Sequence, residues 1–388
     1  MDLFTLNDDE RVITETAAAF AAKRLAPYAL EWDATKHFPV DELRESAELG
    51  MAAIYCRDDV GGSGLRRLDG VRVFEQLAIA DPTTAAFLSI HNMCAWMIDT
   101  FGTAEQRKIW VPRLASMDAI ASYCLTEPGA GSDASALSTR AVKQGDDYVL
   151  DGVKQFISGA GASDVYLVLA RTGGEGPRGI SAFVVEKGTA GLSFGALEEK
   201  MGWHAQPTAQ VILEGVRVPA DAMLGGADGE GAGFGVAMNG LNGGRLNIAA
   251  CSLGGAQAAF DKAGAYLRER QAFGSSLLDE PTIRFTLADM ATGLQTSRMM
   301  LWRAASALDA DDSDKVELCA MAKRYVTDTC YEVADKALQL QGGYGYLREY
   351  GLEKIVRDLR VHRILEGTNE IMRVVIGRAE AARFRATV

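Results

Sequence analysis

The hydrophobic pattern of this 388-residue chain changes twice along its length. Up to about residue 117, apolar residues recur at the spacing of an amphipathic helix, as at Val12, Ile13 and Phe20. Pro27 should kink or divide the first helix, because a proline ring clashes with the preceding helical turn. The helices that this spacing predicts cover residues 7–33, 40–49, 69–80, 83–101 and 103–117.

The middle of the chain, from residue 118 to residue 224, has a different pattern. Its apolar runs are short, rich in β-branched residues, and separated by glycine, aspartate or proline. Such runs are typical of strands, and their number predicts an antiparallel sheet or barrel of roughly seven or eight strands. The clearest predicted strands cover residues 119–126, 139–143, 148–150, 165–171, 180–186 and 210–213.

The helical period returns after the glycine-rich segment 225–235. Gly274 is expected to end the first of these helices as its C′ residue, because glycine readily adopts the left-handed conformation. The predicted helices cover residues 234–273, 281–309, 313–341, 350–357 and 369–385. The pattern therefore predicts an α+β protein with three domains: residues 1–117, 118–224 and 225–388.

Composition narrows the functional classes. Hydrophobic residues make up 48% of the chain and charged residues 24%, as is ordinary for a soluble globular protein. The net charge of −12 would repel a phosphate backbone, so a nucleic-acid partner is not expected. The four histidines lack the spacing of a zinc site, so no metal is expected either.

Cysteine usage and the N-terminus indicate the cellular compartment. The six cysteines are scattered without a C-x-x-C pair, which is typical of a reducing compartment without disulfides. No run of eighteen apolar residues is present, so no membrane-spanning helix is expected. The acidic N-terminus has no signal or transit pattern, which predicts a cytoplasmic protein, or a mitochondrial matrix protein if the chain is a processed one.

Glu366 is the leading candidate for chemistry. It stands in Leu365-Glu366-Gly367-Thr368, a link between two predicted helices, where Thr368 is the expected N-cap and Glu370 follows in the first turn. An acid next to a flexible glycine can project into a cleft. Considered alone, such a glutamate would be a solvated acid at a helix end.

A second candidate segment is rich in small residues whose backbone can approach a polar ligand closely. It reads Tyr123-Cys124-Leu125-Thr126-Glu127-Pro128-Gly129-Ala130-Gly131-Ser132-Asp133. Its glycines match a dinucleotide-binding fingerprint, but that motif requires a helix directly after them. Here the pattern predicts a strand instead, which disfavours a Rossmann unit.

Together, these two segments resemble the acyl-CoA dehydrogenase family of flavoenzymes, and the resemblance extends from about Leu6 to Arg378. It implies a helical N-terminal domain, a β-barrel middle domain and a C-terminal four-helix bundle. It also implies an FAD cofactor, an acyl-CoA thioester substrate, and a homotetramer built as a dimer of dimers. In relatives, amide residues near the flavin nucleotide often stand where this chain has Glu280-Pro281.

The resemblance also implies roles for individual residues, with Glu366 as the catalytic base. The residues expected to bind FAD are Tyr123, Leu125, Thr126, Gly131, Ser132, Phe156, Ile157, Ser158, Arg270, Phe273, Gln339, Gly342, Gly343, Thr368 and Glu370. Arg270, Phe273 and the segment 339–345 are expected to reach the FAD of a neighbouring subunit. The residues expected to bind the substrate are Ser132, Asn242, Arg245, Leu365, Gly367 and Arg378. Asn242-Gly243-Gly244-Arg245 could equally serve only helix packing, since paired glycines indicate close approach of a ligand or another helix.

The implied reaction is α,β-dehydrogenation of an acyl-CoA, with electrons passed to electron-transferring flavoprotein. Residues 89–99 and 240–245, with Leu365 before the base, resemble most closely the branch that acts on isobutyryl-CoA in valine breakdown. Butyryl-CoA and 2-methylbutyryl-CoA stay open, because one methylene changes binding by only about 1–3 kcal/mol. Two other classes also stay open: a flavin oxidase that passes electrons to oxygen, and a non-catalytic flavin-binding relative such as the DNA-binding branch.

Overall fold

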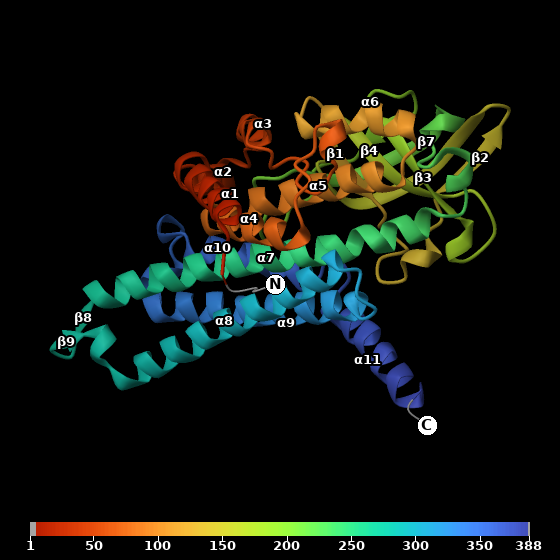
Figure 1. Cartoon of the computed structure of the whole chain (residues 1–388). Coiled ribbons are helices and arrows are strands. Elements are labelled where there is room, and N and C mark those ends of the chain that lie inside the picture. The colour runs from red at the N-terminus through yellow and green to blue at the C-terminus, as the bar shows by residue number, and fades with distance from the viewer. Residues whose placement is uncertain (1–4, 387–388) are drawn as a thin grey trace.

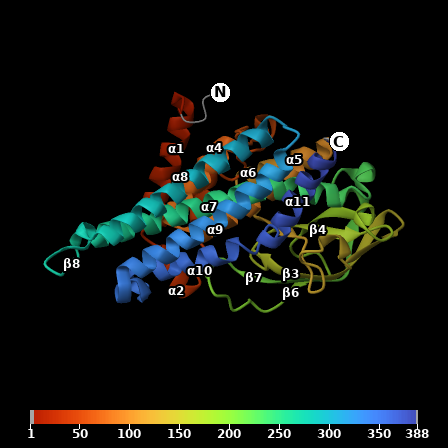
Figure 2. The same cartoon turned by 90° about the horizontal axis from the view of Figure 1, so that it is seen from below.

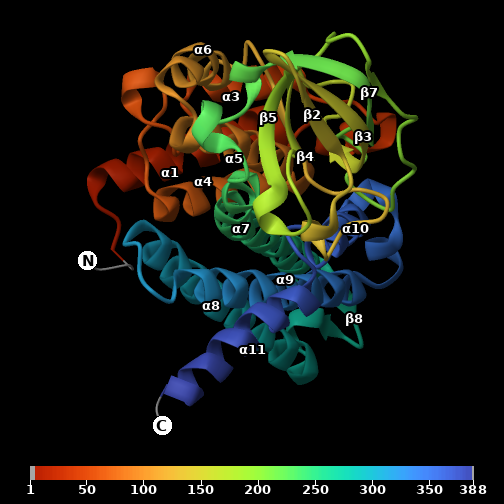
Figure 3. The same ribbon diagram turned by 90° about the vertical axis from the view of Figure 1, so that its right-hand side faces the viewer.

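A computed structural model describes residues 5–386, and its three parts follow the predicted order of helices, sheet and helices (Figure 1). The N-terminal helices and the sheet lie on one side of a long central helix, and the remaining long helices lie on its other side (Figure 3). The predicted α+β fold class is confirmed.

The N-terminal part begins with a helix that Pro27 divides, as predicted. Asn7 caps it by accepting a hydrogen bond from the Glu10 amide at 2.9 Å, and a π-helical segment, Ala21–Leu25, precedes the break. Thr103 and Gln106 form a capping box at the start of the last helix of this part. The helices are α1 (Asp8–Phe20), α2 (Ala29–Thr35), α3 (Val40–Glu48), α4 (Arg67–Ala80), α5 (Pro82–Phe101) and α6 (Ala104–Ala115).

The middle part contains a seven-stranded sheet. Its strands are β1 (Ala121–Cys124), β2 (Arg140–Gln144), β3 (Asp147–Ser158), β4 (Val165–Arg171), β5 (Ile180–Glu186), β6 (Leu192–Phe194) and β7 (Thr208–Pro219). The expectation of a purely antiparallel sheet is wrong, because β4 pairs in parallel with β1 and, through one residue pair, with β2. The chain leaves β1, forms the β2–β3 hairpin, and returns beside β1 in the same direction, so these pairs need a crossover rather than a tight turn.

Up to residue 386, the C-terminal part contains five α-helices and a small hairpin. These elements are α7 (Gly233–Glu269), β8 (Gln271–Ala272), β9 (Ser275–Ser276), α8 (Pro281–Asp309), α9 (Lys315–Gln341), α10 (Leu352–His362) and α11 (Asn369–Ala386). In Figure 2, α7, α8 and α9 run side by side, with the β8 hairpin at their far end. The C-terminal half of α11 points away from the rest of the molecule (Figure 1).

The predicted end of α7 needs a correction. The helix ends at Glu269, and Arg270 is already extended, with φ −73° and ψ 122°. Phe273 and Gly274 instead form the two-residue turn between β8 and β9, and both have positive φ, 52° and 85°. This geometry matches the right-handed twist of a two-stranded hairpin, so Gly274 serves a hairpin turn and not a helix end.

The central helix α7 holds the three parts together. It packs on α4 and α5 on one face and on α8, α9 and α10 on the others. At Gly254 a Cβ atom would lie 2.2 Å from the carbonyl oxygen of Glu75 in α4, so only glycine permits this close approach. None of the helices within residues 5–386 is both long enough and apolar enough to cross a membrane.

Candidate active site

The link that carries Glu366 reverses the chain between α10 and α11. Thr368 caps α11, as predicted, because its Oγ1 accepts a hydrogen bond from the Ile371 amide at 3.3 Å. Glu366 itself has a φ of +57° and Gly367 a φ of +87°. Left-handed backbone at a glutamate costs about 1–3 kcal/mol and is found mainly where the surrounding structure holds it for function.

The side chain of Glu366 is directed against α7. A Cβ atom built on Gly244 would lie 2.6 Å from Glu366 Oε2 and 3.0 Å from the sulfur of Met93. Gly244 therefore provides the space that the carboxylate occupies. This observation explains one of the two paired glycines in α7, which cost the helix about 1 kcal/mol each.

The carboxylate of Glu366 has no fixed partner. Its Oε2 is buried and accepts no hydrogen bond within residues 5–386. Burial raises the pKa of Glu366 to about 7, although the positive charges of Arg245 and Lys323 oppose the shift. A carboxylate with this pKa is a stronger base than a solvated one and is still ionised in part at neutral pH.

Arg245 and Asn242, both predicted to bind substrate, lie beside this carboxylate. Each is about 5% exposed on α7. Arg245 donates from Nε to the backbone oxygen of Glu366 at 3.2 Å and from Nη1 to Asn242 Oδ1 at 2.8 Å. The guanidinium thus fixes the backbone of the link and leaves the carboxylate unbound.

Tyr123, at the end of β1, connects the second predicted segment to Glu366. Its hydroxyl is buried without a partner within the described residues. Burial and the nearby charge of Glu366 raise the pKa of Tyr123 well above its ordinary value, so the hydroxyl keeps its proton. The two segments singled out in the sequence therefore meet here.

The loop after Tyr123 is held by a buried ion pair. Lys154 Nζ on β3 donates to Glu127 Oε1 at 2.7 Å and to the Leu125 carbonyl at 3.2 Å. Glu127 also accepts from the Ser138 amide at 2.6 Å and from the Thr139 amide at 3.0 Å. These contacts outweigh the effect of burial and lower the pKa of Glu127 to about 2.

Phe156 lies where β3 passes this loop. The register of β3 against β7 shifts between Lys154 and Ile157, and Phe156 has a φ of +59° at this bulge. A bulge redirects a side chain, and here it leaves the Phe156 ring 64% exposed while Ile157 is buried. The Gln155 amide donates to Thr126 at 2.8 Å and joins the strand to the loop.

These residues fit a flavin. An exposed aromatic ring on a strained backbone provides a face on which a planar ring system can stack. Cβ atoms added at Gly129 and Gly131 would meet nothing within 4 Å, so there is open space beside the loop at both glycines. Thr126 and Ser158 are half-buried at its edge, and Ser132 is exposed.

Several predicted flavin residues lie far from Glu366 in the same chain. Arg270 and Phe273 follow the end of α7, about 36 Å along the helix from Arg245 at 1.5 Å per residue (Figure 2). Gln339, Gly342 and Gly343 are exposed at the same end, where Tyr344 and Tyr266 have ring centroids 6.0 Å apart. One chain therefore does not bring these residues to Glu366.

The remaining predicted residues also fall into two groups, one near Glu366 and one further from it. Leu365 packs in part against the large hydrophobic core, and Gly367 is half-buried beside Arg245. Glu370 is exposed in the first turn of α11. Arg378 is exposed further along α11, about 14 Å from the start of that helix, and does not approach Glu366.

Two features were not predicted from the sequence. Lys154 and Glu127 form the buried pair that holds the loop after Tyr123, and Lys323 on α9 is completely buried beside the Glu366 link. A signal for Lys323 was present, since it falls at helical spacing among the apolar residues Cys319, Val326 and Cys330. A lysine on the buried face of a helix needs a partner, which the sequence alone does not identify.

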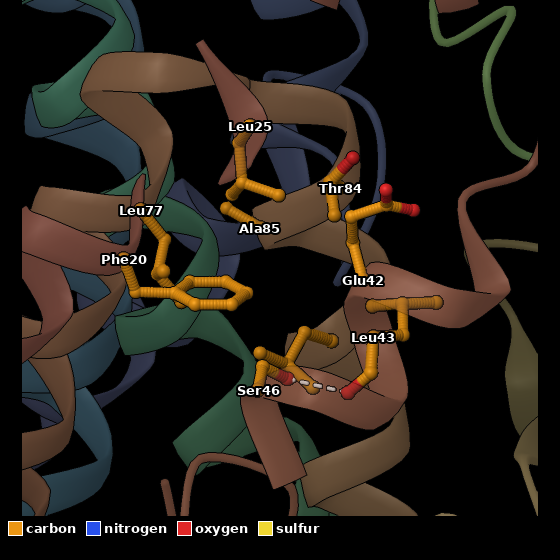
Figure 4. A pocket seen from close by; sticks show the side chains of 9 residues that line it. Phe20, Leu25, Glu42, Leu43, Ser46, Leu77, Thr84 and Ala85 are labelled. Atoms are coloured by element: carbon orange, nitrogen blue, oxygen red, sulfur yellow. Dashed lines mark hydrogen bonds between the residues drawn. The ribbon is translucent and has the colours of Figure 1, made fainter. Parts of the chain in front are cut away.

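A small cavity elsewhere in the structure is not the candidate site. It lies among α1, α3, α4 and α5, lined by Phe20, Leu77 and Leu88 among others (Figure 4). Its volume is about 10 Å³, room for one water molecule at most. Within the described residues, no three His, Cys, Asp or Glu side chains gather into a group that could hold a metal ion.

Comparison with family models matches all three parts of the chain. The models are described as the N-terminal, middle and C-terminal domains of acyl-CoA dehydrogenase, and they match residues 7–118, 122–216 and 231–381. Two similar proteins are mitochondrial isobutyryl-CoA dehydrogenases, from Dictyostelium discoideum at 54% identity and from Bos taurus at 51%. Both comparisons cover 96% of this chain and 89% of the relative.

Solved structures agree with this match. Butyryl-CoA dehydrogenase from Megasphaera elsdenii superposes with a TM-score of 0.94 at 37% identity, covering 98% of this chain and 100% of the other. A chain from work on the electron-transferring flavoprotein of Acidaminococcus fermentans and the mechanism of flavin-based electron bifurcation has a TM-score of 0.94 at 39% identity, with 98% and 99% coverage. Glutaryl-CoA dehydrogenase from Mycobacterium smegmatis, in complex with FADH2, has a TM-score of 0.91 at 28% identity, with 97% and 95% coverage.

Proposed function

The chain belongs to the acyl-CoA dehydrogenase family, and from this premise we propose that it oxidises isobutyryl-CoA to methacrylyl-CoA with Glu366 as the base. The reaction removes a proton from the carbon α to the thioester and a hydride from the β carbon, so that a double bond forms between them. The 54% and 51% identical relatives support the choice of substrate.

The observation that carries the assignment of the base is the unpartnered Oε2 of Glu366. A buried acceptor without a donor costs free energy in the resting protein, and an arriving acidic C–H relieves that cost when its proton is transferred. Glu366 accepts the α proton on its carboxylate and becomes neutral, which is the form that a buried site favours. Arg245 keeps the backbone of the base in place during the transfer.

The backbone of the link is suited to bind the thioester oxygen. The Glu366 amide donates no hydrogen bond within residues 5–386. Negative charge develops on the thioester oxygen as the α proton leaves, and a fixed N–H directed at that oxygen stabilises the charge. We assign this donor role to the Glu366 amide.

FAD is the cofactor that we propose, and when bound it would supply the acceptor for the hydride from the β carbon. Phe156, Ile157 and Ser158 would hold its ring, and the loop through Thr126 and Ser132 would surround its polar parts. The exposed ring of Phe156 and the open space at Gly131 support this placement.

A second copy of the chain would complete the cofactor site. Phe273 is 96% exposed, Tyr346 79% and Phe285 70%, and such a concentration of exposed aromatic rings is typical of an interface. Arg270 and Gly342 lie at this same end, so contact with another subunit would bring them to its FAD. We propose the dimer of dimers that the sequence predicts, with electron-transferring flavoprotein as electron acceptor, in the cytoplasm or the mitochondrial matrix.

Anaerobic mixing of the yellow protein with isobutyryl-, butyryl- and 2-methylbutyryl-CoA tests the substrate. We expect isobutyryl-CoA to bleach the flavin band fastest. Faster bleaching by butyryl-CoA would keep the reaction and replace the substrate, an alternative that is consistent with the similarity to the Megasphaera elsdenii enzyme. Rapid reoxidation of the bleached enzyme by air would instead indicate an oxidase, and no bleaching by any of the three would refute the proposed function.

A further inference from the structure

Lys323 is buried in α9 against the link that carries Glu366. Its exposed fraction is 0%. Its ammonium donates to the backbone oxygen of Gly367 at 2.7 Å and to Asn369 Oδ1 at 2.9 Å. One lysine thus holds the residue directly after Glu366 and the first residue of α11.

We propose that Lys323 is a positioning residue for the proton transfer, which fixes the link around Glu366 and supplies part of the positive field that keeps its carboxylate ionised. The proposal rests on the proposed role of Glu366 as the base. It concerns a residue that would contact neither the substrate nor the cofactor and would act only through Glu366.

The geometry around Lys323 is that of a clamp with several contacts. Asn369 Nδ2 donates to Thr327 Oγ1 at 3.0 Å and to Asp328 Oδ1 at 2.9 Å. Arg363, at the other end of the link, donates from Nε to the same Asp328 oxygen at 2.7 Å. Residues of α9 therefore hold the link before and after Glu366, and this clamp can maintain the positive φ of Glu366 that its sequence does not favour.

The charges that face Glu366 come from four elements. Arg245 of α7 and Lys323 of α9 are the two cations, and both oppose the rise in its pKa that burial causes. Tyr123 of β1 and Cys94 of α5 also face it, but burial raises the pKa of each well above its ordinary value. Both therefore stay neutral, and the positive field on Glu366 comes from Arg245 and Lys323.

The pKa of Lys323 is also shifted from its ordinary value. Burial lowers its pKa to about 7. The repulsion from Arg245 acts in the same direction, and the charges of Glu366, Asp328 and Glu370 oppose the shift. His362 adds no charge, because burial lowers its pKa to about 3. Because burial lowers the pKa of Lys323, an arginine at this position should hold its positive charge at least as firmly as the lysine does.

The effect of the charge at position 323 on the titration of Glu366 distinguishes a positioning role of Lys323 from a purely structural one. A lysine that only satisfies buried acceptors could be replaced by any donor without moving the titration of Glu366. A lysine that also supplies the field should respond to the charge of its replacement. Lys323→Gln keeps a donor without charge, and Lys323→Arg keeps a charge that is not lost at any working pH.

The test compares these two variants with the wild type and with Lys336→Gln, which changes an exposed lysine further along α9. The protonation of Glu366 is followed by infrared difference spectroscopy of its carboxyl group between pH 5 and pH 9, without substrate. The rate of anaerobic flavin reduction by isobutyryl-CoA is measured over the same range, and thermal unfolding shows whether each variant is folded.

We expect Lys323→Gln to move both midpoints upward by about one pH unit, which lowers the rate at pH 7 roughly fivefold and lets it recover at higher pH. Lys323→Arg should leave the midpoints in place or move them downward, and Lys336→Gln should change nothing.

An unmoved infrared midpoint in Lys323→Gln, or an upward shift in Lys323→Arg, would overturn the inference. If Lys323→Gln does not fold, the direction of the shift in Lys323→Arg decides. If the wild-type flavin is not bleached at all, the proposed function fails, while the infrared midpoints still test Lys323.

Discussion

Glu127 and Glu366 are two glutamates of one candidate active site, and the protein surrounds them in opposite ways. Glu127 is 4% exposed, and its carboxylate accepts hydrogen bonds from Lys154, Ser138 and Thr139. Glu366 has a buried Oε2 that accepts none within residues 5–386. The pKa of the first is lowered to about 2 and that of the second is raised to about 7.

The comparison shows how one fold can use the same type of residue for two different functions. Burial raises the pKa of both carboxyl groups. At Glu127 the charge of Lys154 and the hydrogen bonds to its carboxylate outweigh burial, whereas at Glu366 the charges of Arg245 and Lys323 do not. A carboxylate with a counter-charge and several hydrogen-bond donors stays charged and can hold a loop in place. A carboxylate without donors can exchange a proton near neutral pH, which is what a general base requires.

Removing the carboxylate of Glu366 should have the largest effect. Glu366→Gln keeps the shape of the side chain but cannot accept the α proton, so flavin reduction should slow by about 10²–10⁴-fold. The protein should stay folded and yellow, because Oε2 has no hydrogen bond to lose. Stopped-flow measurement of anaerobic bleaching checks this, with Glu332→Gln, an exposed change on α9, as the control. Bleaching within tenfold of the wild type would remove Glu366 from the mechanism.

Removing the carboxylate of Glu127 should instead destabilise the protein. Glu127→Gln leaves the fully buried Lys154 without its counter-charge, which costs about 3–5 kcal/mol. Because the folded pKa of Glu127 lies below its ordinary value of 4.5, the stabilisation is present above about pH 4.5 and is lost as the pH falls toward 2.

Denaturant unfolding at pH 7 and at pH 3 measures both parts of this expectation. The gap between wild type and Glu127→Gln should be smaller at pH 3. The double variant Glu127→Gln/Lys154→Met should recover part of the loss, whereas Glu214→Gln, an exposed change on β7, should be neutral. Equal destabilisation at the two pH values would argue against the ion pair as its cause.

Displacing Glu366 without changing it should have an intermediate effect. In Gly244→Ala the new methyl group would lie 2.6 Å from Oε2, so the carboxylate must move. A displacement of about 1 Å can slow a reaction by roughly 10²-fold. The matched control is Gly264→Ala on the same helix, where a Cβ atom meets nothing within 4 Å. If the two variants reduce flavin at the same rate, Glu366 does not need this position.

The wild-type pH profile should show the smallest effect. The carboxylate is the active form of Glu366, so the rate of flavin reduction should rise with pH and level off above a midpoint near 7. Between pH 6 and the plateau the change should be about tenfold. A flat profile from pH 6 to pH 8 would mean that another group, or an ordinary carboxylate, sets the rate.

The sequence was most informative where the structure is local. The N-cap at Thr368 and the division at Pro27 each depend on residues within one or two turns, and both are confirmed. Gly274 was predicted wrongly because a glycine after a helix ends either the helix or a hairpin turn, and the short hairpin β8–β9 has too few residues to show a strand pattern.

Long-range partners could not be predicted. The contact of Lys323 with Gly367 spans 44 residues and that of Lys154 with Glu127 spans 27. The sequence around one residue of each pair does not identify its partner. The parallel pairing of β1 with β4 is a similar case, because alternation along a strand does not give its direction. The domain boundaries after residues 117 and 224, and the roles of the individual site residues, stay predictions.

Titration of the two glutamates is the most direct test of the contrast between them. Infrared difference spectra of the wild type, Glu366→Gln and Glu127→Gln would follow protonated carboxyl groups from pH 5 to pH 9. We predict a protonated-carboxyl band that disappears around pH 7 in the wild type, is absent in Glu366→Gln, and has no counterpart assignable to Glu127. A Glu366 that is already ionised at pH 5 would contradict the account, since its carboxylate would then be as well stabilised as that of Glu127.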